Sequence, residues 1–186
     1  MPKNRSALVR YEHVTIDMTY KPFNTDTPRQ YVLSPYILKE YRNRWFAVGR
    51  TQEKPYRIST FALDRMITIE KGNGSGFIED PEFNHDEYFR NVIGITVISD
   101  KPVEKIVIRS KEEQAKYIET KRMHSSQKTL ARNEDGTVDI QIEVVPNFEL
   151  FKELLAFGDN IKVLSPLHIA QELADIIKRA LSQYAT

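Results

Sequence analysis

Alternating apolar and polar positions predict a series of short strands over the first 70 residues. Residues 14–20 alternate at the period of a strand with one solvated face. Further extended patterns follow at residues 31–33, 45–48, 56–62 and 66–70. Pro35 interrupts the first of these patterns. A polar hairpin turn is expected at residues 41–44, and a short helix at residues 5–12 precedes the strands. Five short strands at this spacing are typical of a small antiparallel barrel or sandwich.

Strand-like and helical patterns alternate in the second half of the chain. Strands are predicted at 95–98, 105–109, 126–132, 138–145 and 161–164, and the third and fourth of these pair across an Asp-Gly turn. One helix opens with a capping box of Ser110 and Glu113, and a second is capped by Asn147. A last helix opens at Ser165 and Pro166 and carries an apolar stripe, formed by Leu167, Ala170, Leu173, Ala174, Ile177, Leu181 and Tyr184.

These patterns predict an α+β protein of two domains. The expected parts are a lead-in helix over 1–13, a small β-barrel over 14–72, a linker with a short helix over 73–93, and a C-terminal domain over 94–186. Three glycines within residues 71–77 mark the boundary, and the short helix is expected at residues 85–93. The β-α-β-β-α-β order of the C-terminal domain is typical of a ferredoxin-like sandwich, to which a terminal helix is added.

Composition narrows the classes of function. The chain contains no cysteine, which excludes thiolate zinc sites, iron-sulfur clusters and a cysteine nucleophile and favours a reducing compartment. No apolar run reaches the roughly 20 residues that cross a bilayer, and the N-terminus lacks a signal-peptide core. We therefore expect a cytoplasmic protein that makes no use of a membrane.

The net charge of +1 conceals a segregation of charge along the chain. Residues 1–70 and 101–132 are net basic, whereas residues 71–100 and 133–186 are net acidic. Two basic segments can together create a local anion-attracting face in a neutral protein. The alternative is that the two basic segments carry ordinary surface charge and form no binding face.

A search for catalytic residues is negative. The four histidines are far apart in sequence, and no two of them have the i, i+4 spacing of a helical metal site. His124 precedes Ser125 and Ser126, but no glycines form a nucleophile elbow around either serine. The acidic residues at 80–87 are explained by helix capping and by the helix dipole. We expect neither an enzyme nor a bound metal or cofactor.

Aromatic and basic residues are interleaved in the first domain, which is typical of a nucleic-acid-binding barrel. The aromatics are Tyr20, Tyr31, Tyr36, Tyr41, Trp45, Phe46, Tyr56 and Phe61, and the cations are Lys21, Arg29, Arg42, Arg44, Arg50, Arg57 and Arg65. A base stacked on an aromatic ring contributes about 1–3 kcal/mol, and guanidinium groups donate paired hydrogen bonds to phosphates. In so small a domain, about two-thirds of these aromatics are expected to pack in the core.

Four motifs of the first domain resemble the successive signatures of the WYL domain. They are Tyr20-Lys21-Pro22-Phe23, Leu33-Ser34-Pro35-Tyr36, Asn43-Arg44-Trp45-Phe46-Ala47-Val48-Gly49 and Phe61-Ala62-Leu63-Asp64-Arg65-Met66. The naming triplet is Trp45-Phe46-Ala47 in place of Trp-Tyr-Leu, so Phe46 lacks the family's hydroxyl group. Motifs in the second half are similar to the C-terminal extension that follows WYL domains in bacterial regulators, namely Glu87-Tyr88-Phe89, Phe157-Gly158 and Val163-Leu164-Ser165-Pro166-Leu167.

The resemblance implies an Sm-like, SH3-type barrel that senses a ligand within a bacterial transcriptional regulator, typically a homodimer. In such regulators a helix-turn-helix domain binds promoter DNA, and too few residues precede the first strand here to form one. The implied ligand is a single-stranded nucleic-acid fragment or a nucleotide-like molecule. Motif position places its site at Tyr20, Ser34, Trp45, Phe46, Arg57 and Arg65.

Physical reasoning ranks these six residues. Arg57 has no acidic neighbour in sequence and is favoured for phosphate, whereas Asp64 is adjacent to Arg65. Trp45 is expected to anchor the core through its indole, and Tyr20 to place its ring inside with its hydroxyl at the rim. A ligand-sensing domain is the preferred hypothesis. The alternatives are a homodimerisation or protein-interaction module without a ligand of its own and, last, an enzyme.

Overall fold

The computed structural model describes residues 6–8, 14–73 and 75–184. The described residues divide into two compact units, one that ends at His85 and one that begins at Asp86. The division therefore falls after the predicted glycine-rich boundary, because residues 77–83 pack with the first unit. No helix among the described residues combines the length and apolar character needed to cross a membrane.

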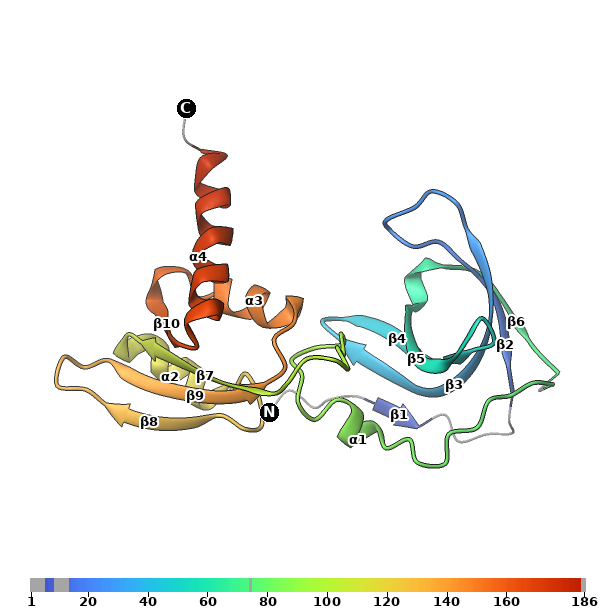
Figure 1. The fold of residues 1–186 in the computed structure, drawn as a ribbon, viewed down its shortest axis with the longest axis horizontal. Helices are drawn as coiled ribbons and strands as arrows, with labels where there is room; N and C mark the ends of the chain where they lie inside the picture. The colour runs from blue at the N-terminus through green and yellow to red at the C-terminus, as the bar shows by residue number, and fades with distance from the viewer. Residues whose placement is uncertain (1–5, 9–13, 74, 185–186) are drawn as a thin grey trace. The chain divides into compact units, whose positions relative to one another are not determined.

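The first unit is built on one antiparallel sheet of six strands, which curves strongly (Figure 1). Its elements are β1 (Ser6–Leu8), β2 (Ile16–Tyr20), β3 (Arg29–Tyr41), β4 (Arg44–Thr51), β5 (Lys54–Ala62), the 3₁₀ helix η1 (Leu63–Arg65) and β6 (Met66–Lys71). The strand order is β5-β4-β3-β2-β6, and β1 pairs with the second half of β3. The predicted lead-in helix is wrong at Ser6–Leu8, which form a strand, and the rest of it lies outside the described residues.

β3 continues through Pro35, where the sequence predicted an interruption. Proline cannot donate a ladder hydrogen bond, and the register between β3 and β4 shifts between Pro35 and Ile37, so the proline is accommodated in an irregularity. Gly49 lies opposite Pro35, and a Cβ at this position would collide with the carbonyl oxygen of Ser34. A glycine is therefore required for the close approach of the two strands.

The turn between β3 and β4 confirms the predicted hairpin. Arg42 and Asn43 both have positive φ, 51° and 61°, as a tight turn between twisted antiparallel strands requires. One face of the sheet carries the core of the unit, a cluster of Met18, Tyr20, Leu33, Ala47 and Phe61. β5 and β6 are the two ends of the strand order, and no pairing within the described part of the chain joins them to close a barrel.

The second unit combines a four-stranded antiparallel sheet with helices, which confirms the α+β class. Its elements are α1 (His85–Tyr88, which begins at the boundary of the units), β7 (Glu104–Ser110), α2 (Glu112–Thr120), β8 (Lys128–Arg132), β9 (Val138–Val144), α3 (Phe148–Leu155), the 3₁₀ helix η2 (Gly158–Asn160), β10 (Ile161–Ser165) and α4 (Leu167–Ser182). The strand order is β10-β7-β9-β8 (Figure 1). Isoleucines of β7 and β9, together with Leu150 and Leu154 of α3, are fully buried and form the centre of the core.

The predicted strand at residues 95–98 is wrong, and the predicted helix at 85–93 is reduced to α1. Polar contacts hold residues 93–96 outside the sheet: the Asn147 side-chain amide donates to the carbonyl oxygens of Ile93 and Thr96, both at 2.9 Å. The same side chain caps α3, as predicted, because its oxygen accepts from the Leu150 backbone amide at 2.9 Å. Asn147 thus joins an irregular segment to the start of a helix.

Two other predicted caps are wrong. Ser110 Oγ donates to the Lys111 carbonyl oxygen, and α2 begins after Lys111 without a side-chain cap. Pro166 occupies the N-cap position of α4, and Ser165 belongs to β10. In both cases the serine is the last residue of a strand, so its conformation is set by the sheet.

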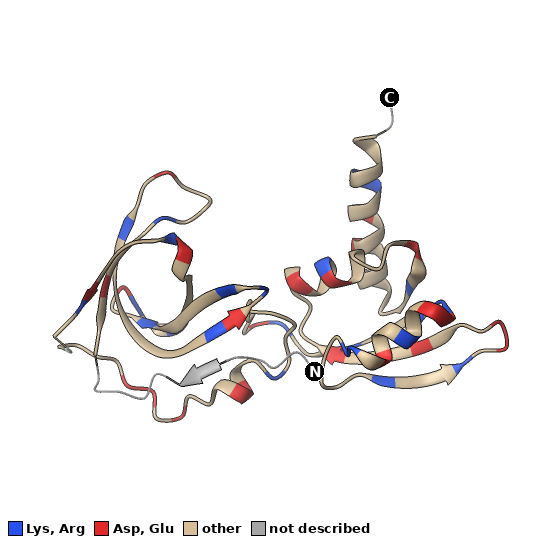
Figure 2. Ribbon diagram, turned by 180° about the vertical axis from the view of Figure 1, so that it is seen from behind, with Lys and Arg blue, Asp and Glu red and all other residues tan. Residues whose placement is uncertain are grey.

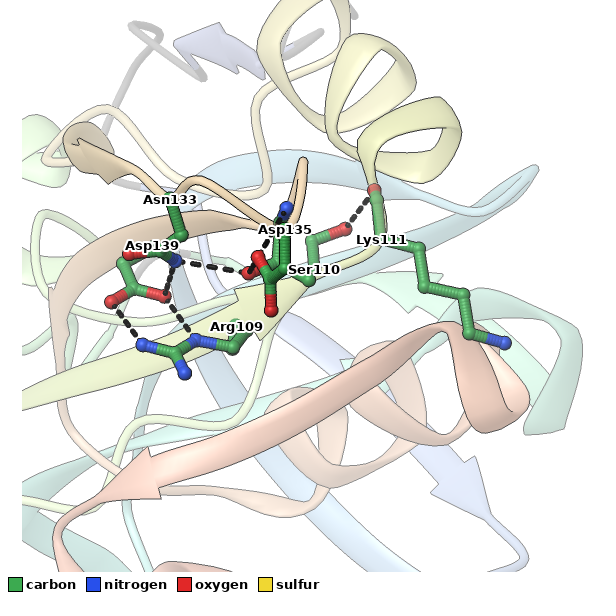
Figure 3. A network of polar contacts seen from close by, with 7 residues as sticks. Arg109, Ser110, Lys111, Asn133, Asp135 and Asp139 are labelled. Atoms are coloured by element: carbon green, nitrogen blue, oxygen red, sulfur yellow. Dashed lines mark hydrogen bonds and ion pairs between the residues drawn. The ribbon is translucent and has the colours of Figure 1, made fainter.

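A polar network fixes the β7–β9 and β8–β9 pairings at one end of the sheet (Figure 3). Arg109 and Asp139 are direct cross-strand partners and form two parallel hydrogen bonds of 2.7 and 2.9 Å. Asn133 Nδ2 donates to Asp139 at 3.2 Å, and Asp135 accepts from the Thr137 backbone amide and hydroxyl within the hairpin turn. The Arg109 hydrogen bonds lower the pKa of the Asp139 carboxyl and raise the pKa of Arg109. The polar atoms satisfy one another, so this network is structural.

Candidate functional site

Tyr20 lies in the core of the first unit. Its side chain is 7% exposed, and its ring meets the rings of Tyr31 and Phe61 edge to face, with centroids 6.4 and 5.0 Å apart. The ring is therefore inside the unit, as predicted. Tyr31 and Phe61, at 5.0 Å from each other, complete an aromatic group that supports the sheet from one side.

Ser34 is fully buried and holds the segment that follows β6. Its Oγ accepts a hydrogen bond from the Ile78 backbone amide at 3.0 Å, and Tyr36 donates its hydroxyl proton to the Ile78 carbonyl oxygen at 2.9 Å. Arg50 pairs with Asp80 at 2.6 Å, and burial raises the pKa of Tyr36. The structure therefore places Ser34 in a structural contact 44 residues away in sequence, which no local pattern indicates.

Trp45 lies at the surface, so the prediction that its indole anchors the core is wrong. Its side chain is 41% exposed, whereas Ala47, two residues further along the same face of β4, is 2% exposed. The register explains the difference. Trp45 pairs with Glu40 of β3 next to the hairpin turn and lies beyond Phe46–Ala62, the last pair between β4 and β5. Phe46 points to the opposite face and is partly buried.

Arg65 lies on an exposed aromatic ring. Its guanidinium carbon is 3.3 Å from the centroid of Phe23, whose side chain is 74% exposed. The Arg65 carbonyl oxygen also accepts from the Lys21 backbone amide at 3.1 Å, so η1 and the segment after β2 are joined. Cation–π stacking of this kind orients a guanidinium group. The Nε atom of Arg65 is buried and has no hydrogen-bond partner among the described residues. Phe23 belongs to one of the four WYL-like motifs, but it is not among the six predicted site residues. The sequence feature that marks Phe23 is its position in a proline-rich turn.

Arg44 is the first residue of β4 and contacts η1. It forms an ion pair with Asp64 of η1, with an N–O distance of 3.7 Å and both side chains about half exposed. Phe23, Arg44, Trp45 and Arg65 therefore gather around η1, and we call these four residues the η1 cluster. It contains two exposed aromatic rings and two guanidinium groups, of which the one of Arg44 pairs with Asp64.

Arg57 does not belong to the η1 cluster. It is exposed on β5, and among the described residues its side chain forms no ion pair or hydrogen bond. Arg57 is adjacent to Ile58, which pairs with Arg50 near the far end of β4. Arg50 lies five residues from Trp45 along the strand, or about 17 Å at the usual rise per residue. Arg57 lies where the register between β4 and β5 shifts, between the pairs Arg50–Ile58 and Thr51–Lys54. Arg57 and Trp45 thus lie near opposite ends of β4.

Acidic residues lie among the basic ones on the first unit, as Figure 2 shows. Lys21 pairs with Asp26 at 3.6 Å, and Arg42 lies 5.6 Å from the centroid of the Tyr41 ring. Several predicted cations therefore have partners within the unit. Tyr56, beside Arg57, is 76% exposed and adds a third accessible ring.

Comparisons with known proteins identify both domains. A WYL domain model matches residues 6–71, and a WCX domain model matches residues 102–181. The chain is similar to proteasome accessory factor B/C (PafBC) of Arthrobacter aurescens, with 19% identity over 86% of this chain and 23% of that chain and a TM-score of 0.37. A crystal structure of a CRISPR Cas-related protein is 16% identical over 92% of this chain and 48% of that chain, with a TM-score of 0.50.

This chain thus spans between about a quarter and a half of the two solved chains. No curated protein matches it. The two family models cover successive segments, and each segment contains one of the two sheets. The chain therefore belongs to the WYL-domain family, with a WYL domain followed by a WCX domain.

Proposed function

We propose that this chain is the ligand-sensing part of a bacterial WYL-type transcriptional regulator. In this proposal the WYL domain binds a single-stranded nucleic-acid fragment or a nucleotide-like molecule, and the WCX domain supports assembly or transmits the bound state. Contact with promoter DNA is assigned to a helix-turn-helix domain that these two domains do not include. The proposal requires no catalysis.

The observations that carry the proposal are the exposure of Trp45 at the start of β4 and the stacking of Arg65 of η1 on Phe23, where η1 follows the β5 residue paired with Phe46. A strand end that leaves an indole 41% exposed offers a flat apolar face to a base. Arg65, oriented by the Phe23 ring, offers hydrogen-bond donors suited to a phosphate. Arg57, which has no side-chain partner among the described residues, provides a second cation near the opposite end of β4 from Trp45.

The separation of these groups favours an oligonucleotide over a mononucleotide. About 17 Å between Trp45 and Arg57 corresponds to roughly five phosphates of a stacked strand, at about 3.4 Å each. A mononucleotide is too short to reach both groups. We therefore expect a single-stranded hexamer to bind at least about tenfold more tightly than a mononucleotide.

The experiment is fluorescence anisotropy of labelled single-stranded DNA and RNA hexamers, combined with the intrinsic fluorescence of Trp45. The chain contains a single tryptophan, so quenching by a stacked base reports on this position alone. If about three phosphates are held, affinity falls on the order of 20-fold between 50 and 200 mM salt. We expect Arg57→Ala and Trp45→Ala each to weaken binding, and Arg57→Ala also to reduce the salt dependence.

The matched control is Arg122→Ala, which removes an exposed arginine from the WCX domain. This variant should bind as the wild type does. Equal losses in Arg57→Ala and Arg122→Ala would indicate nonspecific attraction and contradict a site on the WYL domain. Absence of binding at 50 mM salt would overturn the nucleic-acid ligand altogether.

We also infer that the two sheets correspond to the Sm-like barrel and the ferredoxin-like sandwich expected from the sequence. The order β10-β7-β9-β8 with a β-α-β-β-α-β succession supports the second assignment. The curved order β5-β4-β3-β2-β6, with a 3₁₀ turn before its last strand, supports the first. A homodimerisation module is the second candidate function, and the exposed surface of α4 favours it.

A further inference from the structure

The segment between β6 and α1 is bound to the first sheet along its length. We call residues 75–83 the strap; they form neither strand nor helix. Side chains of β3 bind both backbone groups of Ile78, because its amide donates to Ser34 Oγ at 3.0 Å and its carbonyl oxygen accepts from the Tyr36 hydroxyl at 2.9 Å. The Tyr36 ring also lies beside two aromatic rings of the strap, those of Phe77 and Phe83, with centroids 6.5 and 5.1 Å away.

Arg50 of β4 binds the strap through its charge. Alternation along β4 places Arg50 on the face opposite the core residue Ala47, and its cross-strand partner is Ser34. Arg50 Nη2 donates to Asp80 Oδ2 at 2.6 Å, and Nη1 donates to the Pro55 carbonyl oxygen at 2.9 Å. Nε is buried and has no hydrogen-bond partner among the described residues. Asp80 therefore uses one of the two N–H groups that form this edge of the guanidinium group.

The chain contains a second arginine whose same edge is fully used. Arg109 donates from Nε and Nη2 to the two carboxylate oxygens of Asp139, at 2.7 and 2.9 Å (Figure 3). In Arg50 the same two atoms bind a single oxygen of Asp80. A buried N–H group without a partner costs free energy, and an oxyanion that accepts from both atoms removes this cost. Arg50 therefore has the geometry of an oxyanion site that its intramolecular partner fills by half.

We propose that Arg50 binds a terminal phosphate group through Nε and Nη2, and that Asp80 competes with phosphate for this site from within the chain. A terminal phosphate carries about −1.5 to −2 charges near pH 7 and has more acceptor oxygens than a carboxylate. Residues 50–57 contain two further cations, Lys54 and Arg57, and one acidic residue, Glu53. The Arg50 side chain is 27% exposed, so a small anion can approach its guanidinium group.

Phosphate binding at Arg50 loosens the strap. Exchange of the Asp80 carboxylate for phosphate removes the charged contact between the strap and β4, and leaves the hydrogen bonds of Ile78 to hold it. The strap ends just before α1, at which the two units divide. A phosphate signal is therefore read where the chain leaves the WYL domain. This inference goes beyond the proposed function and does not rest on it, because the site lies around Arg50 and the probe is inorganic phosphate.

The experiment is nuclear magnetic resonance of the full chain, titrated with inorganic phosphate. The effective concentration of a tethered group is in the millimolar range, so a titration to about 50 mM phosphate covers the competition with Asp80. Sodium chloride at matched ionic strength is the reference. We expect the Arg50 Nε signal to shift in a saturable manner and hydrogen exchange of the Ile78 amide to become severalfold faster.

Three variants assign the response to its residues. Asp80→Asn removes the competing charge, so half-saturation by phosphate should fall about tenfold, and Ile78 exchange without phosphate should rise about tenfold or more. Arg50→Lys keeps the charge but cannot donate two parallel hydrogen bonds, and should lose the response to phosphate. The matched control, Asp159→Asn, removes the carboxylate of an exposed ion pair with Lys111 in the second unit and should behave as the wild type. Circular dichroism checks that each variant is folded.

Three results would overturn the proposal. The first is an Arg50 Nε signal and an Ile78 exchange rate that stay unchanged up to the highest phosphate concentration. The second is an equal response to sodium acetate, which would make the site a carboxylate site. The third is a full phosphate response in Arg50→Lys, which would place the phosphate elsewhere.

The source of the phosphate group is distinguished by a single-stranded hexamer with and without a 5′-phosphate. Faster Ile78 exchange with about 100 μM of the 5′-phosphorylated hexamer alone would identify the end of a strand as the source. A response to inorganic phosphate but to neither hexamer would identify free phosphate or a small phosphorylated molecule. Hexamer binding to the WYL domain is measured separately by anisotropy, so its failure leaves the phosphate titration informative, and the reverse also holds.

Discussion

At the residue scale, the exposure of Trp45 determines how much its substitution lowers the free energy of unfolding. Its indole is 41% exposed at the end of β4, whereas Phe61 is 6% exposed in the aromatic group of the core. We expect Trp45→Ala to lower the free energy of unfolding by only about 1 kcal/mol. Phe61→Ala should cost about 3–5 kcal/mol, because it leaves a cavity between the strands. Urea titration followed by circular dichroism compares the two, and an equal loss in both variants would place the indole in the core.

His124 makes the stability of the WCX domain sensitive to mild acid. Its Nε2 donates to the Arg90 carbonyl oxygen at 2.7 Å, and its Nδ1 accepts from the Ser126 backbone amide at 3.2 Å, so the ring is bound in its neutral form. Burial lowers the pKa of His124, although the bond to Arg90 opposes the shift. The unfolded chain then binds more protons than the folded one, and stability falls as pH drops below about 6.5.

The measurement for His124 is the free energy of unfolding at pH 7.5 and pH 5. We expect the wild type to be less stable at pH 5 and His124→Gln to show a smaller difference between the two pH values. Asp135, Asp139 and Asp159 also have lowered pKa values, but they titrate below this window. An unchanged pH dependence in His124→Gln would show that another group is responsible.

At the element scale, the sequence predicted those strands and turns whose determinants are local. The β3–β4 hairpin, the β8–β9 hairpin and the Asn147 cap depend on residues within a few positions of each other, and all three are present. The wrong predictions concern segments whose conformation depends on residues far away in the sequence. Residues 95–98 have a strand pattern, but Asn147 binds the backbone at residues 93 and 96 and keeps it out of the sheet.

The candidate site was predictable in its chemistry more than in its geometry. Sequence motifs identified Trp45, Arg57 and Arg65, but whether each was buried depended on the register of β4 with its neighbours. Ser34 was assigned to a ligand, yet its hydroxyl is occupied by a residue 44 positions away. The apolar stripe of α4 was also predicted correctly as a pattern. The exposure of this stripe, which favours a homodimerisation module, depends on how far α4 extends beyond the sheet.

At the scale of the whole molecule, the two domains have separate cores. The cluster of Met18, Tyr20, Leu33, Ala47 and Phe61 lies within the first unit, and the cluster around Ile106, Ile140 and Leu150 lies within the second. The first core draws on β2, β3, β4 and β5, and the second draws on β7, β9, β10 and the helices α2, α3 and α4. A domain with its own core is able to unfold on its own.

We therefore expect calorimetry of the full chain to resolve two unfolding transitions, each sensitive to substitutions in one core. Phe61→Ala should lower the midpoint of one transition, and Ile140→Ala, at a fully buried position of β9, should lower the midpoint of the other. Losses of about 2–5 kcal/mol shift the midpoint of a domain of this size by roughly 10 °C or more, well beyond the resolution of the method. A single transition that moves equally in both variants would mean that the domains unfold as one cooperative unit. In that case ligand binding on the WYL domain and assembly through α4 would be coupled through folding itself.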